Sequence, residues 1–290
     1  QAHFMLGTSN GFIGGYPYSR HFISCAPIAN AAGKTSSMQR DDWYSTSRMA
    51  NELAKPSLIG QYAAQRALSR LNAKSLSTRR CPVIFEAPIA VGLIGSLVQA
   101  TSGAALYRRS SFLLDSLGKS VMPKHLDLFE LPHLKRQTGS APFDEEGVRT
   151  QARSVVAKGE LQGYFLSSYS ARKLGMQTTG NAGGAHHLRL HSQHTPTGGL
   201  PGLLKEMGTG LLVTELMGQG VNYVTGDYSR GAFGYWVENG EIQHPVEEIT
   251  IAGNLKEMLM DIAAVGDDTI IRGTKETGSI LIGSMTIGGK

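Results

Sequence analysis

Cysteine, aromatic side chains and long apolar runs are scarce in this sequence. Only two of the 290 residues are cysteines, Cys25 and Cys81, and aromatic residues make up 7%. Two cysteines cannot form a disulfide framework, and so small a number is typical of a reducing compartment. The longest uncharged stretch, residues 87–107, is interrupted by a proline, four polar residues and three glycines. It therefore predicts a buried helix rather than a membrane span.

A secretory leader is also missing from the first residues. No basic segment there leads into a continuous apolar core, so we expect a cytoplasmic protein. The chain opens at Gln1 in a segment rich in glycine and aromatic residues, which is typical of the middle of a longer protein. We therefore expect the true N-terminus to lie upstream of Gln1.

Glycine, in contrast, is abundant, with 36 residues and no regular period. Such an excess indicates many turns and close backbone approaches. Hydrophobic residues make up 41% and charged residues 18%, which is the composition of a globular protein. Together with the patterns below, this predicts an α+β fold of mostly antiparallel, glycine-rich β-sheets with a few packed helices.

Local patterns predict where the helices and turns lie. Ser57 is a plausible N-cap for a helix to about residue 73, and residues 89–102 predict a second helix with an Ala/Gly face. Asn239-Gly240 between alternating apolar residues is the strongest hairpin signal. Asn254 is expected to cap a short helix. Residues 118–147 show little periodicity and predict loops. Strands are expected over residues 82–86, 161–166, 210–216, 221–225, 233–238 and 249–252.

The likeliest domain boundary is a short basic linker over residues 74–80. We expect residues 1–76 to belong to an α+β region that continues upstream, and residues 77–290 to form a β-rich domain. Residues 1–80 hold ten Lys or Arg against three Asp or Glu, a net charge of +7, whereas the other 210 residues carry −2. Such a basic segment could face a nucleic acid. Because its charges are dispersed and not interleaved with aromatic residues, a solvated face is favoured and nucleic acid is not.

Several catalytic motifs are matched only in part. Gly7–Gly11 fits the G-x-S-x-G string, but no helix pattern follows it. Gly33-Lys34-Thr35 and Gly118-Lys119-Ser120 lack the earlier glycine of a phosphate-binding loop. Residues 186–194 contain four histidines, but an extended segment spreads them too far apart for one zinc ion without a bend. A metal held at these histidines stays a minor alternative: His186, His187, His191 and His194.

Asp227 and Arg230 are candidate binding residues at the end of a sheet. They lie in Thr225-Gly-Asp-Tyr-Ser-Arg-Gly231, between two expected strands. The alternative is a hairpin turn with a local Asp–Arg pair.

The order and spacing of several segments closely resemble the TldD/PmbA family, and the PmbA (TldE) branch most closely. The resemblance covers nearly the whole chain. The segments that carry it are Pro142–Thr150, Ser168–Gly175, Thr179–Gly184, Met207–Gly220, Thr225–Gly231, Trp236–Ile242 and Ile249–Leu255.

The resemblance implies an intracellular metallopeptidase system that trims or degrades unfolded peptides. In the TldD branch a helical His-Glu-x-x-x-His motif and a later cysteine bind zinc. Pro88 and Leu93 stand at the two histidine positions of that motif and Ile89 at the glutamate, and residues 273–279 contain no cysteine. Proline, isoleucine and leucine offer neither a metal ligand nor a base. We therefore expect no catalytic residue, metal site or cofactor in this chain, although it resembles hydrolases.

The resemblance thus implies a non-metal-binding subunit of a peptidase complex. It pairs in a heterodimer with a TldD-type paralogue that supplies the zinc, or self-associates when alone. Candidate residues for binding a peptide or the partner are Asp227, Arg230, Asn181, Gly183 and Gly184. The alternative function is that of a regulatory binding protein of the DNA gyrase modulator type, without a peptidase role.

Overall fold

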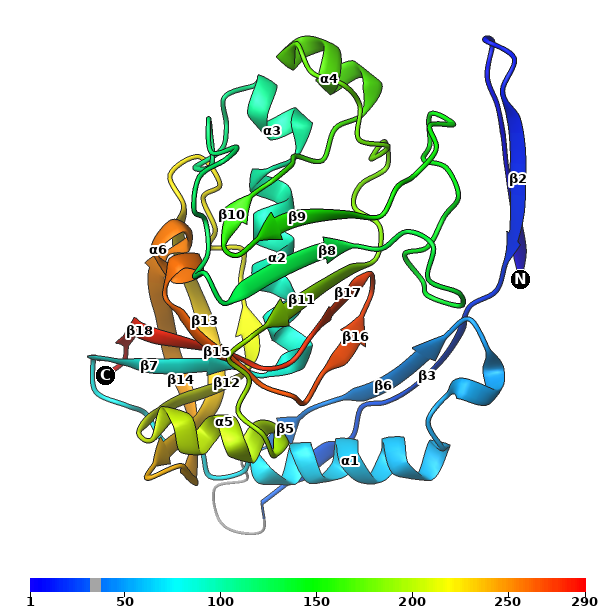
Figure 1. The fold of residues 1–290 in the computed structure, drawn as a ribbon. Helices are drawn as coiled ribbons and strands as arrows, with labels where there is room; N and C mark the ends of the chain where they lie inside the picture. Colours follow the sequence, from blue (N-terminus) through cyan, green and yellow to red (C-terminus); the bar gives the residue numbers. More distant parts are fainter. Residues whose placement is uncertain (32–37) are drawn as a thin grey trace.

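The computed structural model describes residues 1–31 and 38–290. Gly33-Lys34-Thr35 lies outside the described residues. Two six-stranded sheets and six α-helices form the bulk of the fold, with three two-stranded sheets in the first 47 residues (Figure 1). Most strand pairs are antiparallel, so the predicted α+β class is confirmed.

The first large sheet has the order β14-β13-β12-β7-β18-β15. β14 also pairs with β18 through Thr250–Ala252, so five of these strands close on themselves. The pair β7–β12 is parallel, and residues 86–209, which include four strands of the second sheet, connect the two strands. The strands are β7 (Arg79–Phe85), β12 (Gly210–Met217), β13 (Asp227–Glu238), β14 (Glu241–Asn254), β15 (Ile262–Val265) and β18 (Ile280–Gly288).

The second large sheet has the order β10-β9-β8-β11-β17-β16. Its strands are β8 (Leu126–Glu130), β9 (Arg153–Ala157), β10 (Glu160–Leu161), β11 (Leu188–Ser192), β16 (Ile270–Arg272) and β17 (Lys275–Thr277). The small sheets pair β1 (Ala2–Gly7) with β2 (Ile13–Tyr18), β3 (His21–Cys25) with β6 (Trp43–Ser47), and β4 (Ile28–Asn30) with β5 (Met38–Arg40). In Figure 1 the β1–β2 hairpin stands away from the bulk of the chain.

Helix α2 (Ala87–Ala100) lies at the centre of the molecule, as Figure 1 shows. Its buried residues, among them Leu93 and Leu97, share one core with Val213 of the first sheet and Leu128 of the second. This apolar burial fixes the helix between the two sheets. The remaining helices are a 3₁₀ turn (Ala50–Glu52), α1 (Pro56–Ser69), α3 (Gly103–Tyr107), α4 (Ser168–Leu174), α5 (Gly199–Met207) and α6 (Leu255–Met260). None of the helices in the described part of the chain is long and apolar enough to cross a membrane.

Two local predictions are confirmed in detail. Asn239 and Gly240 connect β13 to β14 with φ angles of +53° and +77°, as the expected hairpin turn requires. The Asn254 side chain accepts a hydrogen bond from the Lys256 backbone N–H at 3.0 Å and caps α6.

Other boundaries differ from prediction. α1 begins at Pro56 and not after Ser57, because the fixed φ of proline suits the first turn of a helix. The helix also ends earlier than expected, at Ser69, and Asn72 has a φ of +60°. The second predicted helix, over residues 89–102, corresponds to α2, which begins at Ala87 and ends at Ala100. At its end the Thr101 hydroxyl donates a hydrogen bond to the Leu97 carbonyl oxygen at 2.7 Å.

Two strand predictions and one loop prediction are corrected by the structure. Within residues 161–166 only Leu161 is in a strand, since the backbone of Phe165 bonds to Thr101 and Gly103 instead. Residues 221–225 are a turn with one bridge, because the Asn222 side chain accepts hydrogen bonds from the backbone N–H groups of the next residues. Residues 118–147 contain β8 as well as loops.

Candidate functional site

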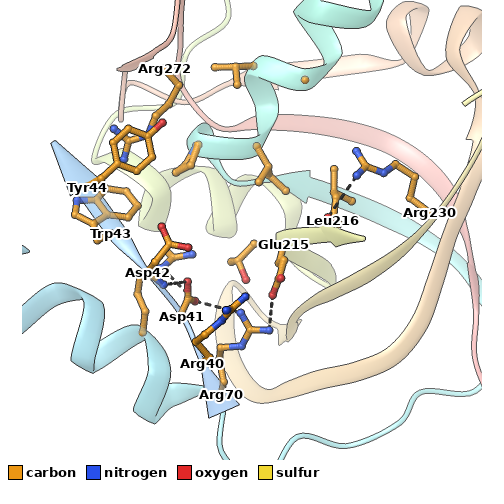
Figure 2. A pocket seen from close by; sticks show the side chains of 16 residues that line it. Arg40, Asp41, Asp42, Trp43, Tyr44, Arg70, Glu215, Leu216, Arg230 and Arg272 are labelled. Carbon is orange, nitrogen blue, oxygen red and sulfur yellow. Dashed lines mark hydrogen bonds and ion pairs between the residues drawn. The ribbon is translucent and has the colours of Figure 1, made fainter. Parts of the chain in front are cut away.

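A groove runs along α2 from Pro88 to Gln99. It consists of two adjoining cavities of about 370 and 460 Å³ that share Ile89, Gly92, Leu216 and Arg230 in their walls. We call the two together the α2 groove. Besides α2 and the end of β12, residues 40–44 and Arg272 of β16 line it (Figure 2). Segments far apart in the sequence therefore meet at this helix.

The positions that correspond to the zinc motif lie in the α2 groove. Pro88 is in the first turn of α2, where proline is tolerated, and lines the groove together with Ile89. Leu93, one turn further on, is buried and lines the second cavity. Hydrocarbon side chains at all three positions supply no ligand for zinc, so these residues do not fit the metal.

The end of β12 forms one wall of the groove with a free strand edge. β12 pairs with β7 only through Leu211–Val213, because β7 ends at Phe85 and the chain turns into α2. The Glu86 backbone N–H still donates to the Val213 carbonyl oxygen at 3.0 Å. Beyond that point, no strand in the described part of the chain pairs with residues 214–217 on this side. An edge of this kind can accept another extended chain.

A chain of ion pairs closes one end of the groove and joins its walls. Arg66 makes a double contact to Glu86 at 2.7 and 3.0 Å and lies 3.3 Å from Asp41. Arg70 contacts the same Asp41 at 3.4 Å and Glu215 at 2.5 Å. Helix α1 is thereby tied to the start of α2 and to β12. The opposite charges of these side chains compensate one another in a partly buried site.

Burial and pairing act on these charges in opposite directions. Burial disfavours the charged form of Arg66, but the hydrogen bonds and charge of Glu86, with Asp41 nearby, outweigh it and raise the pKa of Arg66. Burial raises the pKa of Glu86, and the Arg66 guanidinium opposes that shift. Each partner thus favours the charged form of the other against the effect of burial.

Two models of one protein family together match nearly the whole chain. Residues 78–289 match the model of the PmbA/TldA metallopeptidase C-terminal domain, and residues 1–71 match that of the central domain. The chain belongs to the PmbA/TldD metallopeptidase family.

Its similarity is to the PmbA branch in particular. The chain is 52% identical to the metalloprotease PmbA homolog of Haemophilus influenzae and 50% identical to metalloprotease PmbA of Escherichia coli O157:H7. These alignments cover 98% and 99% of the chain and 62% of each relative, so the chain spans about three fifths of their length.

Solved structures share the fold. A structure described as a putative modulator of DNA gyrase from Bacteroides thetaiotaomicron has a TM-score of 0.89 at 30% identity, covering 97% of this chain and 63% of that one. TldE from Thermococcus kodakarensis has a TM-score of 0.83 at 22% identity, covering 97% and 65%. The latter likeness is one of fold.

In this PmbA-type chain, the candidate residues Asp227 and Arg230 have different surroundings. Arg230 lies in the wall shared by both cavities of the α2 groove. Asp227 is exposed at the start of β13, where it accepts a hydrogen bond from the Thr225 hydroxyl at 2.6 Å. Among the described residues no ion pair joins the two, so the expected alternative of a local Asp–Arg pair is not found.

The other three candidates lie at a separate place. Gly183 and Gly184 line a cavity of about 280 Å³ together with aromatic residues of the β1–β2 hairpin. Asn181 is buried, and its side-chain N–H groups donate to Glu130 at 2.7 Å and to the Gly184 carbonyl oxygen at 3.1 Å. Asn181 therefore holds the glycine loop in shape. These residues and Arg230 do not share a cavity, and a binding role for each stays a prediction.

The four clustered histidines have separate neighbours. His186 contacts the Gly180 carbonyl oxygen, His187 is buried against Glu276 at 2.8 Å, and His194 lies 3.2 Å from Glu206. His191 is exposed in β11. In residues 1–31 and 38–290 no group of three or more metal-binding side chains is found.

Two groove elements were not among the predicted site residues. Asp41, Trp43 and their neighbours form the string Arg40-Asp-Asp-Trp-Tyr44, a conspicuous mixture of charge and aromatic rings that could have drawn attention. Arg272 gives no such signal, since it lies in an ordinary short strand far along the chain. Only the packing of β16 beside α2 brings it to the groove.

Proposed function

We propose that this chain is the non-metal-binding, PmbA-type subunit of a cytoplasmic TldD/PmbA peptidase complex. A TldD-type paralogue supplies the zinc in a heterodimer, and the complex processes or degrades unfolded peptides. The observation that carries the proposal is the hydrocarbon surface of Pro88, Ile89 and Leu93 in an open groove, at positions where the resemblance places two histidine ligands and a glutamate. The curated relatives named metalloprotease TldD homolog, one of them 26% identical over 223 residues, are consistent with such a paralogue.

The α2 groove is suited to an extended peptide. The free edge of β12 at residues 214–217 offers backbone groups that can pair with another strand regardless of its sequence. Thr214 adds a buried hydroxyl without a hydrogen-bond partner in the same wall. Because unfolded chains expose their backbone, this mode selects unfolded peptides over folded proteins. The subunit would hold substrate while the partner cleaves it.

The test is co-expression of the chain with a TldD-type paralogue from the same source. We expect the two to elute as one complex, and we expect chelator-sensitive cleavage of an unstructured peptide by the complex. The chain alone should form no product. Robust cleavage by the pure chain, or no association between the two, would contradict the proposal.

A second function is favoured by one observation. Two similar structures are described as putative modulators of DNA gyrase, and residues 1–80 carry a net charge of +7. Two of these basic residues, Arg66 and Arg70, are occupied by carboxylates in the groove. Binding to duplex DNA that falls steeply with salt would favour this role, and indifference to DNA at moderate salt would remove it.

A further inference from the structure

The α2 groove has more positive than negative side chains. Five arginines line its first cavity against three carboxylates, Asp41, Asp42 and Glu215. Arg66 and Arg70 are neutralised by the ion-pair chain described above. Arg40 is exposed at the rim. The remaining two, Arg230 and Arg272, have no carboxylate within ion-pair distance in the part of the chain that the structure describes.

Arg272 packs against two aromatic rings and forms no ion pair among the described residues. Its guanidinium lies 4.6 Å from the centre of the Trp43 ring and 4.0 Å from that of Tyr44. Contacts of this kind orient the planar group but do not satisfy its N–H donors. The Nε atom is buried and has no hydrogen-bond acceptor in the described structure. The same holds for Arg66 and Arg70, but those two form ion pairs and Arg272 does not. Burial also lowers the pKa of Arg272, as expected for a cation that lacks a close counter-ion.

Arg230 is in a similar condition on the other side of the groove. Its Nε atom is buried without an acceptor among the described residues, its terminal nitrogen donates to the Leu216 carbonyl oxygen at 3.4 Å, and the Tyr228 side chain lies beside the guanidinium. That oxygen belongs to the free edge of β12. Figure 2 shows Arg230 and Arg272 at opposite sides of the cavity, with Glu215 and Leu216 between them in the view. A ligand in the groove would therefore meet two guanidinium groups with unused donors.

We propose that Arg230 and Arg272 make the α2 groove a carboxylate-binding site, so that it selects peptides that carry an acidic group. A carboxylate offers two oxygens to a guanidinium and satisfies two of its donors at once. The acidic group can be an Asp or Glu side chain or the C-terminal carboxylate of the peptide. This inference rests on the proposed peptide-binding function and names the class of peptide.

The test compares four versions of one fluorescent, unstructured peptide. They have either glutamate or glutamine at the centre and either a free or an amidated C-terminus. Their affinities for the wild-type chain are measured by fluorescence anisotropy at fixed ionic strength. We expect loss of the recognised carboxylate to weaken binding about tenfold, since hydrogen bonds to charged groups are stronger than neutral ones. Whichever change matters identifies the source of the carboxylate.

Variants assign the effect to the two arginines. R272Q and R230Q should each weaken binding of the acidic peptide about tenfold and leave the fully neutral peptide unchanged. R272K should recover part of the loss, because lysine restores the charge but not the paired donors. R172Q is the matched control, since Arg172 is exposed on α4 and does not line the groove. It should change neither affinity.

The outcomes separate the inference from the function on which it rests. Equal affinity of the wild-type chain for all four peptides would overturn the carboxylate site and leave peptide binding intact. This comparison needs no variant, so it stands even where a substitution impairs folding. Failure of all four peptides to bind would contradict the proposed peptide-binding role itself, and the carboxylate site with it.

Discussion

Arg66 and Arg272 show how the same side chain takes two roles in one groove. Arg66 is enclosed by Glu86 and Asp41 and links α1 to the start of α2. Arg272 lies against aromatic rings and forms no ion pair among the described residues. A paired guanidinium stabilises the fold, whereas an unpaired one at a cavity wall is available to a ligand.

The Glu86–Arg66 pair predicts a cost in stability when it is broken. Replacing Glu86 by glutamine leaves Arg66 partly buried, with Asp41 as its one remaining carboxylate among the described residues. We expect E86Q to lower the free energy of unfolding by about 2 kcal/mol, because removing one partner of a buried pair strands the other charge. Urea unfolding followed by circular dichroism measures it. The control is E248Q, which breaks an exposed pair with Lys290 and should leave the midpoint unchanged. Equal midpoints for the two variants would contradict the structural role.

Tyr228, beside Arg230 in the groove, predicts a stability difference at high pH. Burial, which Arg230 partly opposes, raises the pKa of Tyr228 to about 12 from 10.0. Between these values the unfolded chain ionises while the folded chain keeps its proton, so stability falls as the pH rises. Between about pH 8 and about pH 11 this loss is about 1.4 kcal/mol, and Y228F should be spared it. Urea unfolding at both pH values tests this. The same loss in both proteins would show that Tyr228 titrates normally.

At the scale of the elements, the groove exists because β7 stops before β12 does. β7 ends at Phe85 and the chain enters α2, which leaves residues 214–217 of β12 without a partner on that side in the described structure. The apolar face of α2 fixes the helix in the core, while Ile89 and Gly92 face the cavities. The end of β7 at Phe85 thus leaves the edge of β12 free and starts α2, which forms the opposite wall of the groove.

Gly92 gives a direct way to close this groove. A Cβ atom added there meets no atom within 4 Å, and the residue lines both cavities. We expect G92W to fill the groove and weaken peptide binding at least about tenfold, without unfolding the chain. G92A is the matched control. It should bind peptide as before and gain up to about 1 kcal/mol in stability, because alanine favours a helix over glycine.

Anisotropy with a labelled peptide and urea unfolding distinguish these effects. Undiminished peptide binding by a folded G92W variant would place the peptide site elsewhere, for example at the cavity beside Gly183 and Gly184.

At the scale of the whole molecule, what the sequence predicted well was encoded locally. Asn239-Gly240 requires left-handed backbone angles, and Asn254 satisfies donors of its own helix, so both are visible in a few adjacent residues. The strand predicted over residues 221–225 is wrong, because the Asn222 side chain competes with strand pairing for the backbone N–H groups. β8 went unpredicted because its strand is short and flanked by long loops.

The candidate site was less predictable for a related reason. Arg230 lies in the groove as a binding residue should, but Asp227 serves a turn and Asn181 supports a loop. Trp43 and Arg272 contact each other only because β6 and β16 both approach the start of α2. Contacts between distant segments are set by tertiary packing, and no local pattern in either segment reports them.

The most direct test of the account is the zinc content of the purified complex with a TldD-type paralogue. Zinc is measured by elemental analysis together with peptidase activity, once with the intact paralogue and once with a paralogue whose zinc ligands are replaced. We predict zinc and activity in the first complex and neither in the second, because Pro88, Ile89 and Leu93 supply no ligand. Stoichiometric zinc or peptide cleavage that persists in the second complex would contradict the account.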